Sequence, residues 1–375
     1  MTTPGVHRDL PWRQNKEQGR EQKQSPEEGS LKRGITLALA LAGIGLFVFV
    51  VVRAGPERIW NTLRRVSLTE LMILVLLRLL FWGLRALNWK AVLERCGGTS
   101  GLFHLLGARM AGHAVGYITP TSRIGGDAFK ALMVKDNPQR NVIASVVIDK
   151  TIELAVTALL IPVGLAMLVL SAPRPPAQTG AFLIVTVLLI VLVVWLIHQQ
   201  KKGFFMRVLD LLNRFKLGRS FRKRYESRIA ETDALMSEFY RSHRDRFFLV
   251  FVGYLVFMAL WTFEIFLSLK FLGCAEITPE KAFLLVILGS VAFVLPGVPG
   301  SVGVYEMTYL SLFVLLGLGP SHAVSLILVR RGLDLLMAAW GMGVILLRGH
   351  SAWSRIFPGK AKPAPVQQEA TLDRR

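Results

Sequence analysis

Cysteine is scarce in this chain: only Cys96 and Cys274 occur among 375 residues. Two thiols cannot build a disulfide framework, so the fold must be held together by other means. The seven histidines show no spacing typical of metal ligands. The sequence also has no phosphate-binding loop, no dinucleotide-binding glycine fingerprint and no nucleophile elbow. These absences give no support for an enzyme, and we expect no cofactor and no bound metal.

Acidic residues are also few, with 25 Asp and Glu against 45 Lys and Arg, and the formal net charge is +20. The cations concentrate in polar tails and connections, which fits the positive-inside rule better than nucleic-acid binding. Hydrophobic residues make up 52% of the chain, and its mean hydropathy is +0.45. A soluble domain is not this apolar, so the composition indicates an integral membrane protein.

Several apolar runs approach the roughly 20 residues that cross a bilayer as a helix. We expect full spans at 34–52, 68–92, 141–170, 180–197, 247–271 and 321–347. A polar, disordered tail is predicted over 1–33, a transmembrane domain over 34–350 and a polar tail over 351–375. The segment 198–246 carries 13 Lys and Arg against 6 Asp and Glu. Within it, 204–215 has the pattern of an amphipathic helix, either lying on an anionic leaflet or serving as a plain linker.

Two further apolar segments are interrupted by proline and glycine, which end or kink helices. The predicted helix-break residues are Pro120, Gly125, Gly126, Pro296, Pro299, Gly300 and Gly303. An acidic residue, Asp127 or Glu306, stands seven positions after a proline in each segment. Irregular backbone at membrane depth is tolerated only where protein or a water-filled cavity covers it. Each break is therefore a candidate substrate site.

The basic segment 198–246 helps to decide the topology. If 101–135 enters and leaves the membrane on one side, the basic segment 198–246 and both tails fall on the cytoplasmic side. The segment 280–318 then enters from the opposite side, three spans later. We therefore predict an all-α polytopic membrane protein with about six full spans and two re-entrant helical hairpins in an inverted repeat. The spacing of Lys150 and Glu153, which matches that of Arg331 and Asp334, supports the duplication.

Ionisable residues occur inside several apolar runs, where an unpaired charge costs at least about 2.5–3.5 kcal/mol. The candidate substrate-binding residues are Asp127, Lys130, Asp149, Lys150, Glu153, Glu306, Arg330, Arg331 and Asp334. They could form structural ion pairs, or line a pathway for a phosphate-bearing or zwitterionic head group. Two interpretations also stay open for Asp127 and Glu306. They could stabilise the first turns of helices capped by Ser122 and Ser301, or pair with Lys150, Arg330 or Arg331 across the repeat interface.

The motif from Pro120 through Gly126, Asp127 and Lys130, followed by Asp149 and Lys150, resembles the flippase-like transmembrane family. This family is also called the lysylphosphatidylglycerol synthase transmembrane region. The Leu-Pro-x-x-Pro-Gly-x-x-Gly-x-x-Glu motif at 295–306, with an arginine at 330 or 331, strengthens the resemblance. The resemblance covers about 34–350, although Asp and Lys replace the usual Glu and Arg in the first motif.

The resemblance implies a lipid translocase that moves a polar-headed lipid across a bacterial-type cytoplasmic membrane without nucleotide hydrolysis. We expect the partners to be membrane lipids with anionic or zwitterionic head groups, and we expect no binding to nucleic acid. Because the sequence ends at Arg375 without a soluble aminoacyltransferase domain, we do not expect synthase activity. A membrane-embedded lipid-modifying transferase and a non-catalytic partner of a lipid-synthesis enzyme remain alternatives.

Overall fold

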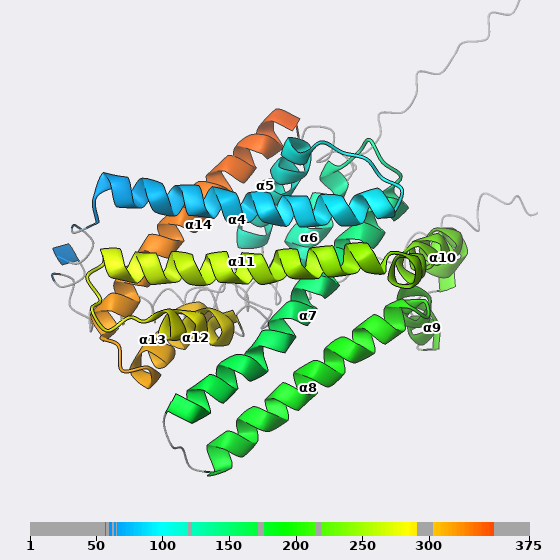
Figure 1. The fold of residues 1–375 in the computed structure, drawn as a ribbon. Coiled ribbons are helices and arrows are strands. Elements are labelled where there is room, and N and C mark those ends of the chain that lie inside the picture. The colour runs from blue at the N-terminus through cyan, green and yellow to red at the C-terminus, as the bar shows by residue number, and fades with distance from the viewer. Residues whose placement is uncertain are drawn as a thin grey trace, which may run out of the picture.

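A computed structural model describes residues 57, 60–61, 64, 66–118, 122–171, 176–214, 219–290 and 303–348. Within these ranges the fold is entirely helical, with eleven helices and no strand (Figure 1). In chain order the helices are α4 (Leu68–Arg95), α5 (Leu102–Ile118), α6 (Ser122–Met133), α7 (Gln139–Ser171), α8 (Pro176–Gln200), α9 (Phe204–Arg214), α10 (Arg219–Ser242), α11 (Arg244–Phe271), α12 (Pro279–Gly289), α13 (Val304–Leu315) and α14 (Pro320–Arg348). The expected tails at 1–33 and 351–375 and the expected span at 34–52 lie outside the described residues.

Helices α4 and α11, each 28 residues long, lie side by side and run in opposite directions (Figure 1). Helix α4 begins at a capping box, because the Ser67 side chain accepts from the Glu70 amide and the Glu70 carboxylate accepts from the Ser67 amide. Glycine permits the close approach of the two helices: a Cβ on Gly253 of α11 would lie 2.1 Å from the Asn88 side chain of α4.

Helices α5, α6 and α14 form a second tightly packed group. A Cβ on Gly126 of α6 would lie 2.3 Å from the Gly112 carbonyl oxygen of α5, and one on Gly341 of α14 would lie 2.0 Å from the Met110 carbonyl oxygen. Small residues of this kind let helix backbones approach closely in membrane proteins. Gly125 and Gly126 therefore do not break a helix as predicted. They lie inside α6, where a glycine costs only about 1 kcal/mol and allows this contact.

The interruption itself falls where the sequence indicates, since α5 ends at Ile118 and α6 begins at Ser122. In the C-terminal part, α12 begins with Pro279 after an N-cap from the Thr278 hydroxyl and ends at Gly289. Helix α13 then begins after Gly303, whose φ of +89° suits glycine. The break residues Pro120, Pro296, Pro299 and Gly300 lie outside the described residues.

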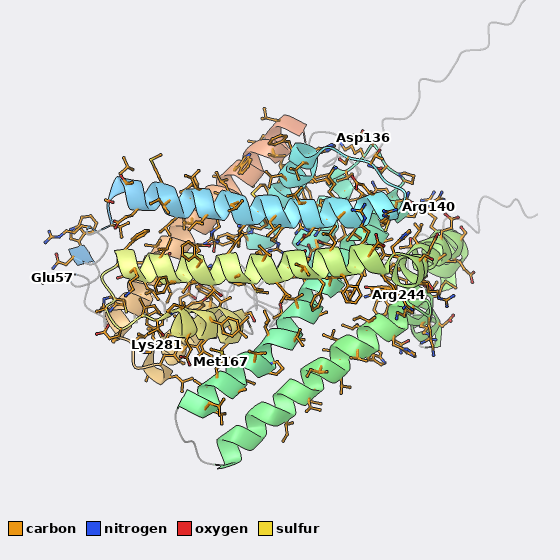
Figure 2. The ribbon with its side chains drawn as sticks, in the orientation of Figure 1. Glu57, Asp136, Arg140, Met167, Arg244 and Lys281 are labelled. Carbon is orange, nitrogen blue, oxygen red and sulfur yellow. The ribbon has the colours of Figure 1, made fainter. Side chains whose placement is uncertain are left out.

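Within the described residues, two helical stretches are long and apolar enough to cross a membrane, namely Gln139–Leu170 and Arg244–Phe271. Large apolar side chains are exposed along α7 and α8, among them Leu159, Val163, Val187 and Leu188. The exposed charged residues Asp136, Arg140 and Arg244 lie together at one end of the molecule in Figure 2. Exposed apolar sides with charged ends are typical of a bundle surrounded by lipid.

The basic segment 198–246 is more ordered than its composition indicates. The amphipathic helix predicted at 204–215 is present as α9 (Phe204–Arg214). The Asp233 carboxylate accepts from the amides of Phe205 and Met206 at 3.0 and 2.8 Å, so α10 holds the first turn of α9. Helix α10 was not predicted, and it packs against α7, α9 and α11.

Candidate functional site

Asp149 on α7 is the most enclosed carboxylate of the candidate site, with a relative exposure of 0%. Arg109 of α5 donates to one of its oxygens at 2.5 Å, and the Tyr254 hydroxyl of α11 donates to the other at 2.6 Å. The Lys130 ammonium of α6 lies 3.5 Å from the oxygen that Arg109 also contacts. Four helices thus converge on one carboxylate, which makes this point a junction of the bundle.

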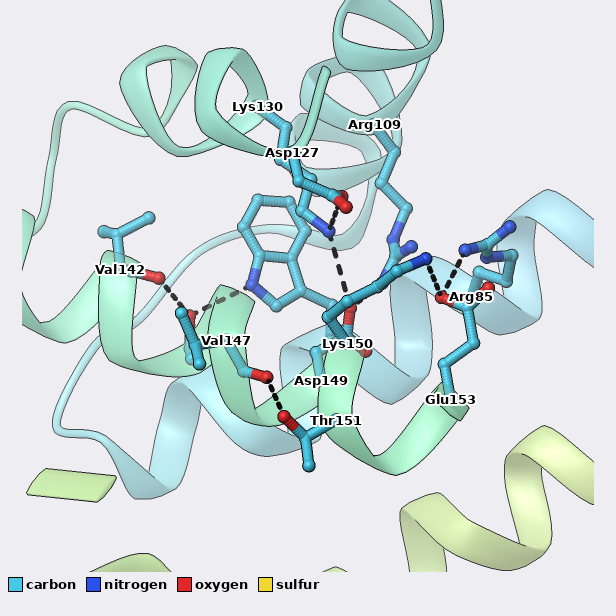
Figure 3. Close-up of polar contacts among 12 residues, drawn as sticks. Arg85, Arg109, Asp127, Lys130, Val142, Val147, Asp149, Lys150, Thr151 and Glu153 are labelled. Atoms are coloured by element: carbon cyan, nitrogen blue, oxygen red, sulfur yellow. Dashed lines mark hydrogen bonds and ion pairs between the residues drawn. The ribbon is translucent and has the colours of Figure 1, made fainter. Parts of the chain in front are cut away.

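Lys130 lies between two carboxylates, as Figure 3 shows. Its ammonium is 2.8 Å from Asp127, one turn earlier on α6, in addition to its contact with Asp149. The Trp89 ring of α4 lies beneath both cations, with centroid distances of 5.1 Å to Lys130 and 5.6 Å to Arg109. The aromatic face stabilises positive charge that is removed from water.

Glu153, one turn after Asp149 on α7, accepts from two cations at the same oxygen. Arg85 of α4 donates at 2.7 Å and Lys150 of α7 at 3.2 Å (Figure 3). Arg85 also lies over the Phe257 ring of α11 at 5.1 Å. We call Arg85, Arg109, Asp127, Lys130, Asp149, Lys150 and Glu153 the first charge cluster.

The first charge cluster joins four cations to three carboxylates. With all seven groups ionised it carries one positive charge in excess. Its most exposed side chains are Lys150 at 27% and Asp127 at 26%, whereas Asp149 and Arg109 are fully enclosed. The cluster therefore has enclosed members and two partly exposed members, and these two carry one charge of each sign.

A second charge cluster includes Arg78, which lies nearer the N-terminus of α4 than Arg85. Arg78 donates to Glu264 of α11 at 2.6 Å and to Asp334 of α14 at 2.9 Å. Arg78 and Glu264 are both almost fully buried. A buried carboxylate needs such a partner, because removing one member of a buried pair costs about 3–5 kcal/mol. Arg78 thus joins the three long helices α4, α11 and α14.

Glu306 and Arg331 form the other ion pair of the second cluster. Arg331 of α14 donates from Nε and Nη2 to one Glu306 oxygen at 3.0 and 2.7 Å. The other Glu306 oxygen accepts from the Gly303 amide at 2.7 Å, so Glu306 stabilises the first turn of α13 as well. Arg331 also donates to the Tyr117 hydroxyl at 3.2 Å, and this bond reaches α5 just before the interruption between α5 and α6.

Arg330 differs from its neighbours. Its side chain is 3% exposed, and its guanidinium lies 5.3 Å from the centroid of the Trp261 ring on α11. No hydrogen-bond acceptor among the described residues reaches its Nε or Nη1. The second charge cluster consists of Arg78, Glu264, Glu306, Arg330, Arg331 and Asp334.

The structure thus divides the predicted site residues between two clusters. Asp127, Lys130, Asp149, Lys150 and Glu153 lie in the first, and Glu306, Arg330, Arg331 and Asp334 lie in the second. Of the two interpretations left open for Asp127 and Glu306, stabilisation of a first helical turn holds for Glu306, and Glu306 also pairs with Arg331, one of the predicted cations, at 2.7 Å. The expected location of such pairs across the two halves is not found for these two acids among the described residues. Each has its ion-pair partner within its own half, Lys130 for Asp127 and Arg331 for Glu306, because these partners lie on the same or the next helix.

Three local predictions also need correction. Helical spacing predicts that Asp334 pairs with Arg330 or Arg331, but its ion pair is with Arg78 at 2.9 Å. The N-cap of α13 is Gly303 rather than Ser301. Ser122 is the first residue of α6, which places Asp127 in the second turn. Lys150 and Glu153, which stand three residues apart on α7, form an ion pair at 3.2 Å.

Sequence reasoning did not include several residues that complete the site, namely Arg78, Arg85, Arg109, Tyr117, Tyr254 and Glu264. Most of them carried a detectable signal, because an ionisable side chain within an apolar helix must find a partner. The sequence contained no signal that identifies the partner of each residue. Arg78 and Glu264 are 186 residues apart, and Arg331 and Tyr117 are 214 residues apart.

Comparison with known proteins identifies the family of this chain. The family model of the lysylphosphatidylglycerol synthase transmembrane region matches residues 35–341. The chain belongs to this family. A UPF0104 membrane protein of Pyrococcus horikoshii is 22% identical to this member of the family over 337 residues, which cover 83% of this chain and 96% of the relative. No solved structure gives a significant match. Membership of the family makes this a membrane protein and confirms the resemblance seen in the sequence motifs.

Proposed function

We propose that the protein is a lipid translocase, which moves a polar-headed phospholipid across the membrane without nucleotide hydrolysis and without chemical change to the lipid. The observation that carries the proposal is the buried charge on helices whose outer faces are apolar. Ionisable residues at membrane depth most often mark a pathway for a polar substrate. Membership of a membrane family agrees with this proposal.

The proposed architecture has about six spans and two re-entrant hairpins in an inverted repeat. The series α4–α5–α6–α7 and α11–α12–α13–α14 support it, because each has a long helix, two shorter helices and a second long helix. The opposite directions of α4 and α11 also fit two inverted units (Figure 1). In transporters of this design, interrupted helices meet near the middle of the bilayer and bind the substrate there.

The first charge cluster suits a head group that carries a phosphate. Its excess positive charge favours an anion, and Lys150 is its most accessible cation. Asp127, the accessible carboxylate, suits an ammonium or hydroxyl group on the same head group. A site with both signs of charge can accept an anionic or zwitterionic lipid with little net desolvation cost.

We further propose that the protein lies in a cytoplasmic membrane of the bacterial type, with both termini on the cytoplasmic side. The basic residues of 198–246 support this orientation, since cytoplasmic connections are rich in Lys and Arg. The same surface could hold a lipid-synthesis enzyme close to the site.

Reconstitution of the full chain into liposomes tests the proposal. A fluorescent phosphatidylglycerol in the inner leaflet should become accessible to a membrane-impermeant quencher faster than in empty vesicles. The Lys150→Gln variant should lose most of this transport, whereas Arg241→Gln, which removes an exposed cation on α10, should keep it. Transport no faster than in empty vesicles would refute the proposal. A chemically altered lipid would point to a transferase instead.

A further inference from the structure

Arg330 is a buried cation that makes no ion pair within 4.0 Å with a described residue. The residue is 3% exposed, and two of its nitrogens, Nε and Nη1, have no acceptor among the described residues. A buried guanidinium without an acceptor is costly, because the N–H groups lose their hydrogen bonds to water. Its contact with the Trp261 ring stabilises the positive charge but provides no hydrogen-bond acceptor for the nitrogens.

The nearby carboxylates are already engaged. Arg78 binds both Glu264 and Asp334, at 2.6 and 2.9 Å. Arg331 binds Glu306 with two nitrogens, and the second Glu306 oxygen accepts from a backbone amide. The second charge cluster is neutral in total, with three arginines and three acids, but its ion pairs leave Arg330 without a direct partner.

The matching position in the first half makes the contrast clear. The spacing that relates Lys150 to Arg331 relates Asp149 to Arg330. Asp149 is fully satisfied, with bonds from Arg109 and Tyr254 and a contact with Lys130. At equivalent places in the sequence, the carboxylate of Asp149 thus has hydrogen-bond partners for both oxygens, whereas the guanidinium of Arg330 has two nitrogens without an acceptor among the described residues.

We propose that Arg330 binds a phosphate-type oxyanion through Nε and Nη1, and that Trp261 orients the guanidinium plane for this contact. Two adjacent N–H groups of arginine match two oxygens of a phosphate. The same chemistry is offered by the phosphodiester of a lipid and by free phosphate. The proposal that the oxyanion is a lipid phosphate rests on the proposed function, since it makes Arg330 a further contact for the head group in addition to the first charge cluster.

Ligand-induced thermal stabilisation of the full chain in detergent tests this inference. The probes are short-chain phosphatidylglycerol, inorganic phosphate and short-chain diacylglycerol, which lacks the phosphate. We expect an oxyanion probe to raise Tm of the wild type, and diacylglycerol to have no effect. Stabilisation by phosphatidylglycerol alone assigns the site to a lipid, whereas equal stabilisation by phosphate assigns it to a free anion. No stabilisation of the wild type by either oxyanion would overturn the inference.

The Arg330→Gln variant separates binding from structural support. It should weaken oxyanion binding by roughly tenfold to a hundredfold, the worth of a hydrogen bond to a charged group. Without ligand it should melt at or above the wild-type temperature, because an unsatisfied buried charge is gone. Arg241→Gln, the exposed control, should bind as the wild type does. Equal affinity in Arg330→Gln and the wild type would refute the site.

If Arg330→Gln does not fold, Arg330→Lys serves instead. It keeps the charge but loses the two-pronged contact, so oxyanion affinity should still fall, and unchanged affinity would refute the site. Binding and transport also fail separately. Binding that depends on Arg330 without transport in liposomes would keep this site and refute the translocase, whereas transport with unchanged binding in the variant would do the reverse.

Discussion

Arg331 donates two hydrogen bonds to a single oxygen of Glu306, at 2.7 and 3.0 Å, while the other oxygen accepts from the Gly303 amide. One carboxylate therefore fixes both the start of α13 and the position of α14. Because Arg331 also reaches Tyr117 at 3.2 Å, the contact extends to the end of α5. The two interrupted segments of the chain are joined through this arginine.

Replacing Glu306 with alanine should destabilise the protein by about 3–5 kcal/mol, because Arg331 would keep its charge in a largely buried place without a carboxylate. Thermal or denaturant unfolding in detergent measures this change. The double variant with Arg331→Ala should recover part of the loss, giving a coupling energy of about 0.5–3 kcal/mol. Glu276→Gln, at an exposed carboxylate, is the control. Additive losses in the double variant would contradict the pairing.

Lys150 and Arg85 bind the same oxygen of Glu153 but should behave differently when replaced. Lys150 is partly exposed and Arg85 still pairs with Glu153 in its absence, so Lys150→Gln should cost less than about 1 kcal/mol of stability. Arg85 is the closer and more buried partner, and Arg85→Gln should cost about 3 kcal/mol or more. Parallel unfolding and transport assays should therefore show lost transport with near-normal stability only for Lys150→Gln. Equal destabilisation by both variants would contradict this assignment.

Gly126→Ala should separate α5 from α6, because its Cβ would lie 2.3 Å from the Gly112 carbonyl oxygen, which belongs to the backbone and cannot rotate away. Overpacking of this kind costs about 1–3 kcal/mol. Gly83→Ala on α4 is the matched control, since nothing lies within 4 Å of its Cβ. That variant should be neutral or slightly stabilised, as alanine favours a helix by up to about 1 kcal/mol. Equal Tm values for the two variants would contradict the close packing.

Burial raises the pKa of the Cys96 thiol, in the connection after α4, to about 12, and the charge of Glu238 adds to the effect. In an unfolded chain a thiol ionises near pH 8.5. The neutral thiol therefore contributes stability that is complete below about pH 8.5 and is lost as the pH rises toward 12. In a Cys274→Ser background, a maleimide at pH 8 should label Cys96 only after unfolding.

The pH dependence of this thiol has its own control. Cys96→Ser removes the titrating group, so the fall in stability between about pH 9 and 12 should become less steep than in the wild type. Rapid labelling of the folded chain at pH 8 would show that the thiol is accessible and would refute the interpretation. Cys96 and Cys274 are the two cysteines of the sequence, so the background variant leaves a single signal.

Most of the long helices could be located from the sequence, because a run of apolar residues can be recognised without knowledge of tertiary contacts. Helix α4 begins at Leu68 as predicted, and α11 begins at Arg244, three residues before the predicted start. Helix α10 was missed because Arg219–Ser242 is polar and forms through contacts with other helices rather than through an apolar run. The prediction that Gly125 and Gly126 break a helix failed for a related reason, because tertiary packing outweighs the low helix propensity of glycine.

Some members of the candidate site could be predicted from the sequence, but most of their partners could not. The cost of burying charge singles out Asp149, Arg330 and Glu306 from composition alone. Which cation meets which carboxylate depends on how distant helices pack, and no spacing rule connects Asp149 with Tyr254, 105 residues away. The short-range pairs, Asp127 with Lys130 and Lys150 with Glu153, follow helical periodicity and need no tertiary information.

Asp233 of α10 links the amphipathic helix α9 to the rest of the bundle. This one carboxylate accepts from the amides of Phe205 and Met206 in the first turn of α9, so α9 is held to α10, which packs on α7, the long helix that bears Asp149 and Glu153. We therefore expect a change in the tilt of α7 to alter the position of α9. A spectroscopic probe on α9 should then report rearrangement among the buried charges.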